Sequence, residues 1–168
     1  MTFATMAQYV ERNLADETAR YLNGKSDSFS GYFGPNNYFN EDTVKTVMSR
    51  LLTDWIMAND SEETAMVFSE LHYTGFANRA DIGVVYLTED GQAAPTQTLY
   101  IELKTDFSAE SVDGDVNLLD LIAGAGNSPI TSAYAFYTVF EGEEGWTRYI
   151  EVPTQPNVHT VGIRVTSP

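Results

Sequence analysis

The chain has 168 residues, of which 24 are acidic and 9 basic, so its formal net charge is -15 at pH 7. A chain of this length fits one domain, because a single hydrophobic core can stabilise it without disulfides. The absence of cysteine excludes a disulfide scaffold, a thiolate zinc site and a cysteine nucleophile, and with two histidines any metal ion must be held mainly by oxygen.

The start of the chain, Met1 to Val10, has neither a basic segment nor a continuous apolar one. It therefore does not resemble a signal peptide. No apolar run approaches the roughly 18 residues that a membrane-spanning helix needs. We expect a cytoplasmic protein with no membrane partner.

The first predicted element is a helix from Thr5 to Leu22. Its apolar residues are spaced so that they share one face: Met6, Tyr9, Val10, Leu14 and Tyr21. Gly24 is expected to end the helix, and residues 26–40 to form a loop rich in aromatic residues. The aromatic side chains either pack on the domain or stack on the bases of single-stranded nucleic acid. Residues 1–40 would thus precede a core formed by residues 41–165.

A second helix is predicted from Glu41 to Met57, with Asn40 as its N-cap. The acidic residues Glu41 and Asp42 lie in the first turn, where negative charge interacts favourably with the helix dipole. Its apolar residues form the clearest helical stripe in the sequence: Val44, Val47, Met48, Leu51, Leu52, Trp55 and Ile56.

Short apolar or alternating runs follow, which are typical of strands. The predicted strands are Ala65 to Tyr73, Ile82 to Leu87, Thr98 to Leu103, Ala133 to Phe140, Trp146 to Val152 and His159 to Val165. The second and third are expected to form an antiparallel hairpin. A helix is predicted from Val116 to Ala125. This order indicates an α/β fold with a mixed sheet of about five strands flanked by helices.

Charged residues interrupt two of these strands. Asp81 opens the second strand, in the segment RADIGVVYL, and Glu102 and Lys104 lie in the third, in the segment YIELKT. Residues two apart in a strand point to the same face of the sheet. If the two strands are neighbours, Asp81 and Glu102 lie within a few ångströms of each other.

Two neighbouring carboxylates are unfavourable when buried, because each raises the pKa of the other. A divalent cation would reverse that cost. Oxygen atoms from Asp81, Glu102 and the carbonyl of Leu103 would suit Mg²⁺ or Mn²⁺. Lys104 would stand beside the ion, where it could orient or deprotonate the attacking water.

At these residues the chain resembles the PD-(D/E)xK superfamily, which has the restriction-endonuclease-like fold. Asp81 is similar to the first motif of that family, and Glu102, Leu103 and Lys104 to the second. The resemblance implies an acidic residue on the preceding helix, here Glu41, and another on the preceding strand, here Glu70. It further implies a single nuclease-like domain over residues 1–168 and metal-dependent hydrolysis of DNA, for which dimers are common.

Some features depart from the family pattern. Ala80 stands where the family often has proline, and the helix after the third strand offers Asn117 and Asp120 instead of Gln or Lys. The net charge would repel DNA, so we also consider a non-catalytic protein that binds a basic partner or serves as a subunit of a nuclease complex. Glu70 and His72 either belong to the site or simply face solvent on an alternating strand.

Overall fold

The computed structural model describes residues 2–29, 41–61, 64–73, 76–87, 93–105, 109–124, 130–141 and 157–166. The helices are α1 (Phe3–Tyr9), α2 (Ala15–Phe29), α3 (Glu41–Asn59) and α4 (Ala109–Gly124), with a π-helical segment, η1 (Val10–Leu14), between α1 and α2. The strands are β1 (Ala65–His72), β2 (Arg79–Leu87), β3 (Ala93–Lys104), β4 (Ile130–Glu141) and β5 (Val158–Thr166).

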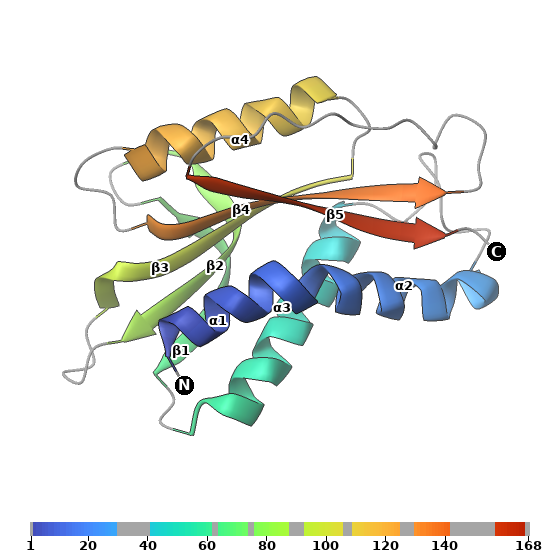
Figure 1. The fold of residues 1–168 in the computed structure, drawn as a ribbon, viewed down its shortest axis with the longest axis horizontal. Helices are drawn as coiled ribbons and strands as arrows, with labels where there is room; N and C mark the ends of the chain where they lie inside the picture. Colours follow the sequence, from blue (N-terminus) through green and yellow to red (C-terminus); the bar gives the residue numbers. More distant parts are fainter. Residues whose placement is uncertain are drawn as a thin grey trace.

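The five strands form one sheet in the order β1-β2-β3-β4-β5. The pairs β1–β2 and β2–β3 are antiparallel, whereas β3–β4 and β4–β5 are parallel. Helix α4 covers one face of the sheet, and α1, α2 and α3 lie on the other (Figure 1). The predicted α/β class, with a mixed five-stranded sheet flanked by helices, is confirmed.

The N-terminal helical region is longer than predicted. It runs through Gly24 and ends at Phe29, so the expected stop at Gly24 is wrong. A glycine in a helix interior costs only about 1 kcal/mol relative to alanine. Packing of α2 along β5 outweighs that cost. The rest of the predicted loop, residues 30–40, lies outside the described residues, as does the proposed cap Asn40.

Helix α3 begins at Glu41, as predicted, and ends two residues later than expected. The stripe is confirmed as the buried face: Val44, Met48, Leu52 and Ile56 are buried, and Val47, Leu51 and Trp55 pack against them half-buried. This face anchors α3 to the sheet and fixes where its first turn lies.

Several predicted boundaries are wrong. Strand β2 begins at Arg79 instead of Ile82, because Ala80 is buried and pairs with Leu71 of β1. Helix α4 begins at Ala109 instead of Val116, because its buried stripe already includes Val112. The strand predicted over Trp146 to Val152 lies outside the described residues.

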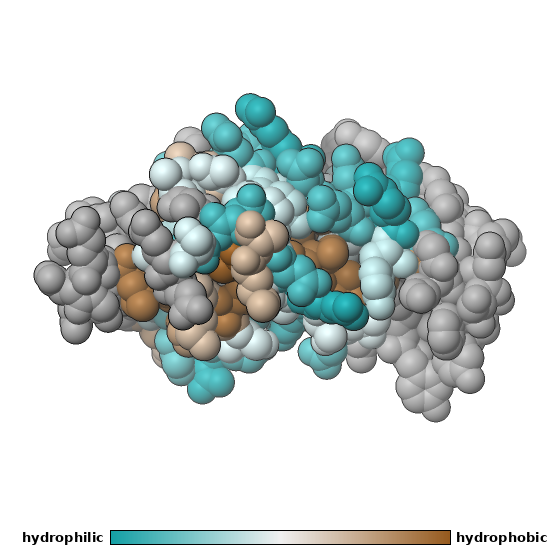
Figure 2. All heavy atoms as spheres, turned by 90° about the horizontal axis from the view of Figure 1, so that it is seen from below, coloured by the Kyte–Doolittle hydropathy of each residue, from teal (hydrophilic) through white to brown (hydrophobic). Residues whose placement is uncertain are grey.

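The core lies on both faces of the sheet. The larger cluster joins α1, α2 and α3 to the sheet and includes Ile82, Ile101 and Leu103. The smaller cluster joins α4 to the other face and includes Tyr73 and Tyr100. On the side of α1, α2 and α3, hydrophilic side chains surround a few hydrophobic ones (Figure 2). No helix within the described ranges is both long and apolar enough to cross a membrane.

Two glycines should respond oppositely to alanine. At Gly83 in β2 a Cβ atom would lie 2.2 Å from Leu71 Cδ2 and 2.7 Å from Leu71 Cβ. We expect Gly83→Ala to lower the free energy of unfolding by about 1–3 kcal/mol through overpacking. At Gly114 in α4 nothing lies within 4 Å. Gly114→Ala should therefore raise the free energy of unfolding by about 0.5–1 kcal/mol. Urea unfolding measures both, and changes of the same sign would contradict the packing described for Gly83.

Candidate functional site

The candidate site begins with two carboxylates on neighbouring strands. Ile82 of β2 pairs with Ile101 of β3 in antiparallel register, so Asp81 lies directly opposite Glu102. Glu102 shares the face of Tyr100, towards α4, whereas the alternation of β2 is interrupted at Asp81, because Ala80 packs in the α4 cluster and Ile82 in the cluster of α1, α2 and α3. Asp81 Oδ2 accepts a hydrogen bond of 2.8 Å from the amide of Leu103. The backbone of β3 thereby fixes the carboxylate of Asp81 beside Glu102.

Glu102 is the most deeply buried acid of the site, with an exposed fraction of 7%. The hydroxyl of Tyr73, just after β1, donates a hydrogen bond to Glu102 Oε1. Burial, together with the negative charge of Asp81, raises the pKa of Glu102 to about 8, although the Tyr73 hydrogen bond acts in the opposite direction. Burial beside a second carboxylate therefore favours the protonated form of Glu102.

Lys104, at the end of β3, contacts two further acids. Its Nζ lies 3.1 Å from Asp115 Oδ2 and 3.7 Å from Glu41 Oε2. Burial alone would lower the pKa of Lys104, but Asp115 and Glu41 raise it. Burial also raises the pKa values of Asp115 and Glu41, against the effect of Lys104. Lys104 is thus held in its protonated form between α3 and α4.

A second lysine contacts the carboxylate pair directly. Lys45 of α3 places Nζ 3.0 Å from Asp81 Oδ1 and forms an ion pair with Glu70 Oε1. Burial acts to lower the pKa of Lys45, but its hydrogen bonds to Glu70 and Asp81 outweigh that effect and raise it. The amine beside Asp81 is therefore Lys45, while Lys104 lies with Asp115 and Glu41.

Glu70 reaches this cluster through an unusual backbone conformation. Its φ angle is 58°, in the left-handed region that glycine favours. The pairing of β1 with β2 passes from Ser69–Ile82 to Leu71–Ala80 and skips Glu70. Such a conformation costs a non-glycine residue about 1–2 kcal/mol, and backbone strain of this kind clusters at functional sites.

All five predicted catalytic residues lie in this one cluster: Glu41, Glu70, Asp81, Glu102 and Lys104. Three further members of the cluster were not predicted from the sequence: Lys45, Tyr73 and Asp115. Lys45 follows Glu41 by one helical turn, a spacing that could have indicated it. Asp115 lies three residues after Val112 and four before Leu119, on the buried face of α4. That signal was hidden because the helix was expected to begin at Val116.

Two residues next to the cluster are exposed. His72 and Arg79 pair across β1 and β2, and Arg79 Nε lies 2.8 Å from His72 Nε2. Both side chains are exposed, so His72 faces solvent, which is one of the two outcomes expected from the sequence. Glu70 is exposed as well, with 49% of its side chain accessible, but it also forms an ion pair with Lys45.

The donor set is suited to a hard divalent cation. Asp81 and Glu102 supply carboxylate oxygens, the ligands that Mg²⁺ and Mn²⁺ prefer. Leu103, whose carbonyl was the third predicted ligand, has a buried side chain. Across the part of the chain that the structure describes, no three Asp, Glu or His side chains converge as a metal site.

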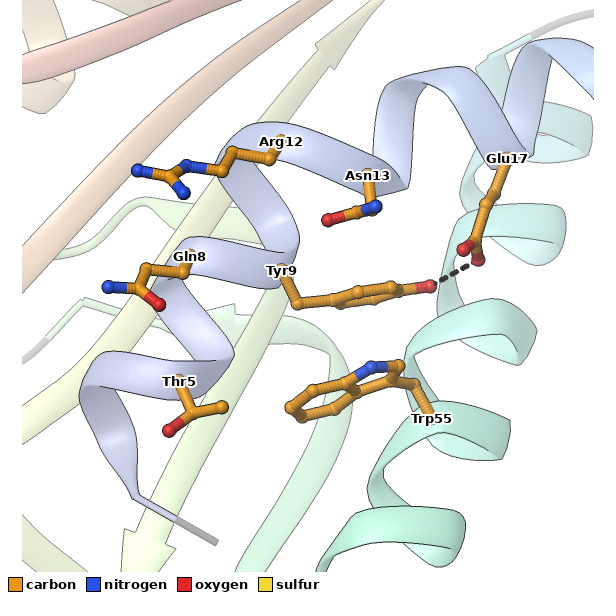
Figure 3. A pocket seen from close by; sticks show the side chains of 7 residues that line it. All are labelled: Thr5, Gln8, Tyr9, Arg12, Asn13, Glu17 and Trp55. Carbon is orange, nitrogen blue, oxygen red and sulfur yellow. Dashed lines mark hydrogen bonds between the residues drawn. The ribbon is translucent and has the colours of Figure 1, made fainter.

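A separate pocket lies between the N-terminal helical region and α3 (Figure 3). Its volume is about 310 Å³, and its lining residues are Thr5, Gln8, Tyr9, Arg12, Asn13, Glu17 and Trp55. Tyr9 stacks on Trp55 with ring centres 4.6 Å apart, and its hydroxyl donates to Glu17 Oε2 at 2.6 Å. No predicted site residue lines this pocket, and its aromatic pair serves to join α1 to α3.

The hydrogen bond from Tyr73 allows a direct test of the electrostatics of Glu102. We expect Tyr73→Phe to raise the pKa of Glu102 above about 8, because the ionised carboxylate loses a donor. Carboxyl carbon chemical shifts followed by NMR against pH measure this value. Tyr21→Phe, an exposed change in α2, is the control and should leave it unaltered. A Glu102 pKa that falls in Tyr73→Phe would contradict the hydrogen bond.

The fold and the site together define an α/β protein with a mixed five-stranded sheet and a partly buried cluster of acids and amines where β1, β2 and β3 meet the first turn of α3. In comparisons with known proteins, no protein family model matches the chain and no curated protein is significantly similar to it.

Proposed function

We propose that this cluster is the catalytic site of a metal-dependent nuclease of the PD-(D/E)xK type, which hydrolyses phosphodiester bonds in DNA. The observation that carries the proposal is the juxtaposition of Asp81 and Glu102 on neighbouring strands, with Glu102 buried and its pKa raised. A fold keeps a costly pair of buried acids where function requires them. The restriction-endonuclease-like core is part of this proposal, and the mixed sheet is compatible with it.

Asp81 and Glu102 would hold Mg²⁺ or Mn²⁺, with the Leu103 carbonyl as a further oxygen ligand. When bound, the ion would supply Lewis-acid stabilisation of the phosphate and make a water molecule more acidic. The reaction adds that water across a P–O bond and leaves a phosphomonoester and an alcohol. Binding of the ion requires Glu102 to lose its proton.

The two acids that contact Lys104 determine its charge, and its charge determines its role. Because Asp115 and Glu41 raise its pKa, Lys104 is positively charged at neutral pH and is a poor base. A fixed positive charge at this position would stabilise the negative charge that develops on the phosphate. Lys104 would thus orient substrate, and Glu41 and Asp115 would position Lys104.

The distribution of lysine supports a role in binding phosphate. The chain has three lysines, and two of them, Lys45 and Lys104, lie in this cluster. In a chain with a net charge of -15, these two lysines partly offset the five carboxylates of the cluster where a phosphate would have to approach. We expect the reaction to take place in the cytoplasm, with DNA as substrate.

Incubation of the purified chain with circular, linear and single-stranded DNA tests the proposal. Cleavage should occur with Mg²⁺ or Mn²⁺ and stop when EDTA is added. An RNA oligonucleotide in parallel establishes which nucleic acid is cut. Absence of cleavage of every substrate with both ions would refute the proposal.

One observation favours a second candidate function, a non-catalytic protein that binds a basic partner. Each carboxylate of the cluster already has a protein partner, since Lys45 contacts Asp81 and Glu70, Lys104 contacts Asp115 and Glu41, and Tyr73 contacts Glu102. Such a protein would take up no Mn²⁺ in a calorimetric titration and would bind a basic protein. Uptake of Mn²⁺ together with cleavage favours the nuclease.

A further inference from the structure

We propose that strand β1 is a dimer interface, at which two copies of this chain pair their β1 strands edge to edge and antiparallel. β1 is the first strand in the order of the sheet, and within the described part of the chain its only neighbour in the sheet is β2. No residue of β1 is buried, so the outer edge of the strand is accessible. The inference goes beyond the proposed function and does not depend on it.

The register of β1 with β2 identifies the backbone groups at this edge. The Leu87 amide donates to the Thr64 carbonyl at 2.7 Å, so Thr64 bonds towards β2. Bonded and non-bonded residues alternate along an antiparallel ladder, so Met66 and Phe68 also bond towards β2. The residues whose amides and carbonyls point outward are Ala65, Val67 and Ser69. An edge with such groups is a template for a further strand.

The left-handed backbone of Glu70, with φ at 58°, ends this stretch. After Glu70 the alternation is reversed, because the Tyr73 amide donates to the Asn78 carbonyl at 3.2 Å. Odd-numbered residues therefore bond inward after Glu70 and point outward before it. The stretch that can pair with a further strand is residues 65–69, which carry no charged side chain.

Apolar side chains lie beside this edge on one face of the sheet. Met66 pairs with Val85, which points away from the cluster of α1, α2 and α3 that contains Val84. On that face α4 packs mainly against β4. Met66 is 60% exposed, and Leu87, two residues after Val85, is 39% exposed. A partner at the edge of β1 would cover this apolar surface.

A second copy of the chain complements this edge in both hydrogen bonds and side chains. Antiparallel pairing about a two-fold axis at Val67 places Val67 opposite itself and Ala65 opposite Ser69, so that all the outward amides and carbonyls of the stretch are bonded. Met66 then lies opposite Phe68 of the second copy on each side of the axis. These are two apolar cross-strand pairs, which stabilise a sheet.

Charge and preorganisation favour the same partner. Residues 65–69 are uncharged in a chain with a net charge of -15, so two copies can meet here without bringing like charges into contact. A basic partner would be attracted to the acidic surface instead of this uncharged strand. A flexible peptide would lose conformational entropy on pairing, whereas β1 is already ordered within a folded copy.

Sedimentation equilibrium of the full chain at several concentrations tests this proposal. We expect a reversible dimer that becomes tighter as NaCl is added, because salt screens the repulsion between two acidic copies. Met66→Lys places a charge against Phe68 of the second copy on each side of the axis and should weaken the dimer at least about tenfold. Ser69→Pro removes an outward amide, leaves the bonds between β1 and β2 in place, and should also weaken the dimer.

Leu121→Lys is the control, because it introduces the same charge at a position of α4 that is 65% exposed. This variant should dimerise as tightly as the wild type. Circular dichroism establishes that each variant is folded, and Ser69→Pro decides if Met66→Lys is not.

A single cysteine gives a second readout, because the chain contains no cysteine. Val67→Cys should form a disulfide-linked dimer on mild oxidation, since hydrogen-bonded cross-strand residues have Cα atoms about 5.5 Å apart, a separation that a disulfide spans. Leu121→Cys should stay monomeric on a denaturing gel.

A wild-type chain that is monomeric at every concentration and salt would overturn the proposal. So would dimers that persist in folded Met66→Lys and Ser69→Pro, or that dissociate equally in Leu121→Lys.

Discussion

Replacing Glu102 with Gln should lower metal-dependent DNA cleavage by at least about 100-fold, because the amide cannot provide the negative charge that holds the ion. Lys104→Ala should cause a loss of about the same size by removing a fixed positive charge beside the phosphate. Initial rates on a labelled DNA duplex, at saturating Mg²⁺ and again at saturating Mn²⁺, measure both losses.

Matched controls lie on the surface of the helices. Glu11→Gln repeats the chemical change of Glu102→Gln at a half-exposed position, where Glu11 lies 3.9 Å from the imidazole of His159. Arg50→Ala is the control for Lys104→Ala, because it removes a positive charge at an exposed position of α3. Both controls should keep wild-type rates. Rapid cleavage by Glu102→Gln would refute the assignment of the site, provided that circular dichroism shows the variant to be folded.

The same Glu102→Gln variant should be more stable than the wild type at alkaline pH. The folded protein raises the pKa of Glu102 from 4.5 to about 8, so between these values the folded state binds more protons than the unfolded state. The contribution of Glu102 to stability is therefore fully present below about pH 4.5 and is lost as the pH rises through about 8. The loss is on the order of 3–5 kcal/mol.

Gln keeps an oxygen that can accept from Tyr73 and has an amide that can donate to Asp81, as a protonated carboxyl group does. Urea unfolding of both proteins from pH 4.5 to 9 measures the difference. The wild type should lose stability relative to Glu102→Gln across this range, and saturating Mn²⁺ should restore part of it. Parallel curves for the two proteins would contradict the raised pKa of Glu102.

Much of the fold follows from apolar spacing. The stripe of α3 is explicit because seven apolar residues recur at helical intervals, and burial confirms it. Asp81 and Glu102 were predicted as neighbours because charge stands out in a strand that is otherwise apolar. The hairpin of β2 and β3 needed only the rule that consecutive strands usually pair.

Other features of the fold and the site depend on tertiary contacts, which the spacing of apolar residues does not encode. Gly24 and the acidic start of α4 resemble breaks between elements, yet both are helical because packing outweighs local preference. The sequence also could not predict that Lys45, and not Lys104, contacts Asp81. Lys104 has the motif spacing, but Asp115 of α4 draws it away from Asp81, and Lys45 of α3 reaches Asp81 instead.

The change in strand direction within the sheet divides the chain into two parts. The antiparallel strands β1, β2 and β3, with α3 before them and α4 after them, supply every charged group of the cluster from the contiguous stretch between Glu41 and Asp115. The parallel strands β4 and β5 supply none of these groups and serve as support. Mutations in the segment from Ile130 to Thr166 could accordingly accumulate, or that segment be exchanged for another, while the reacting groups keep their spacing.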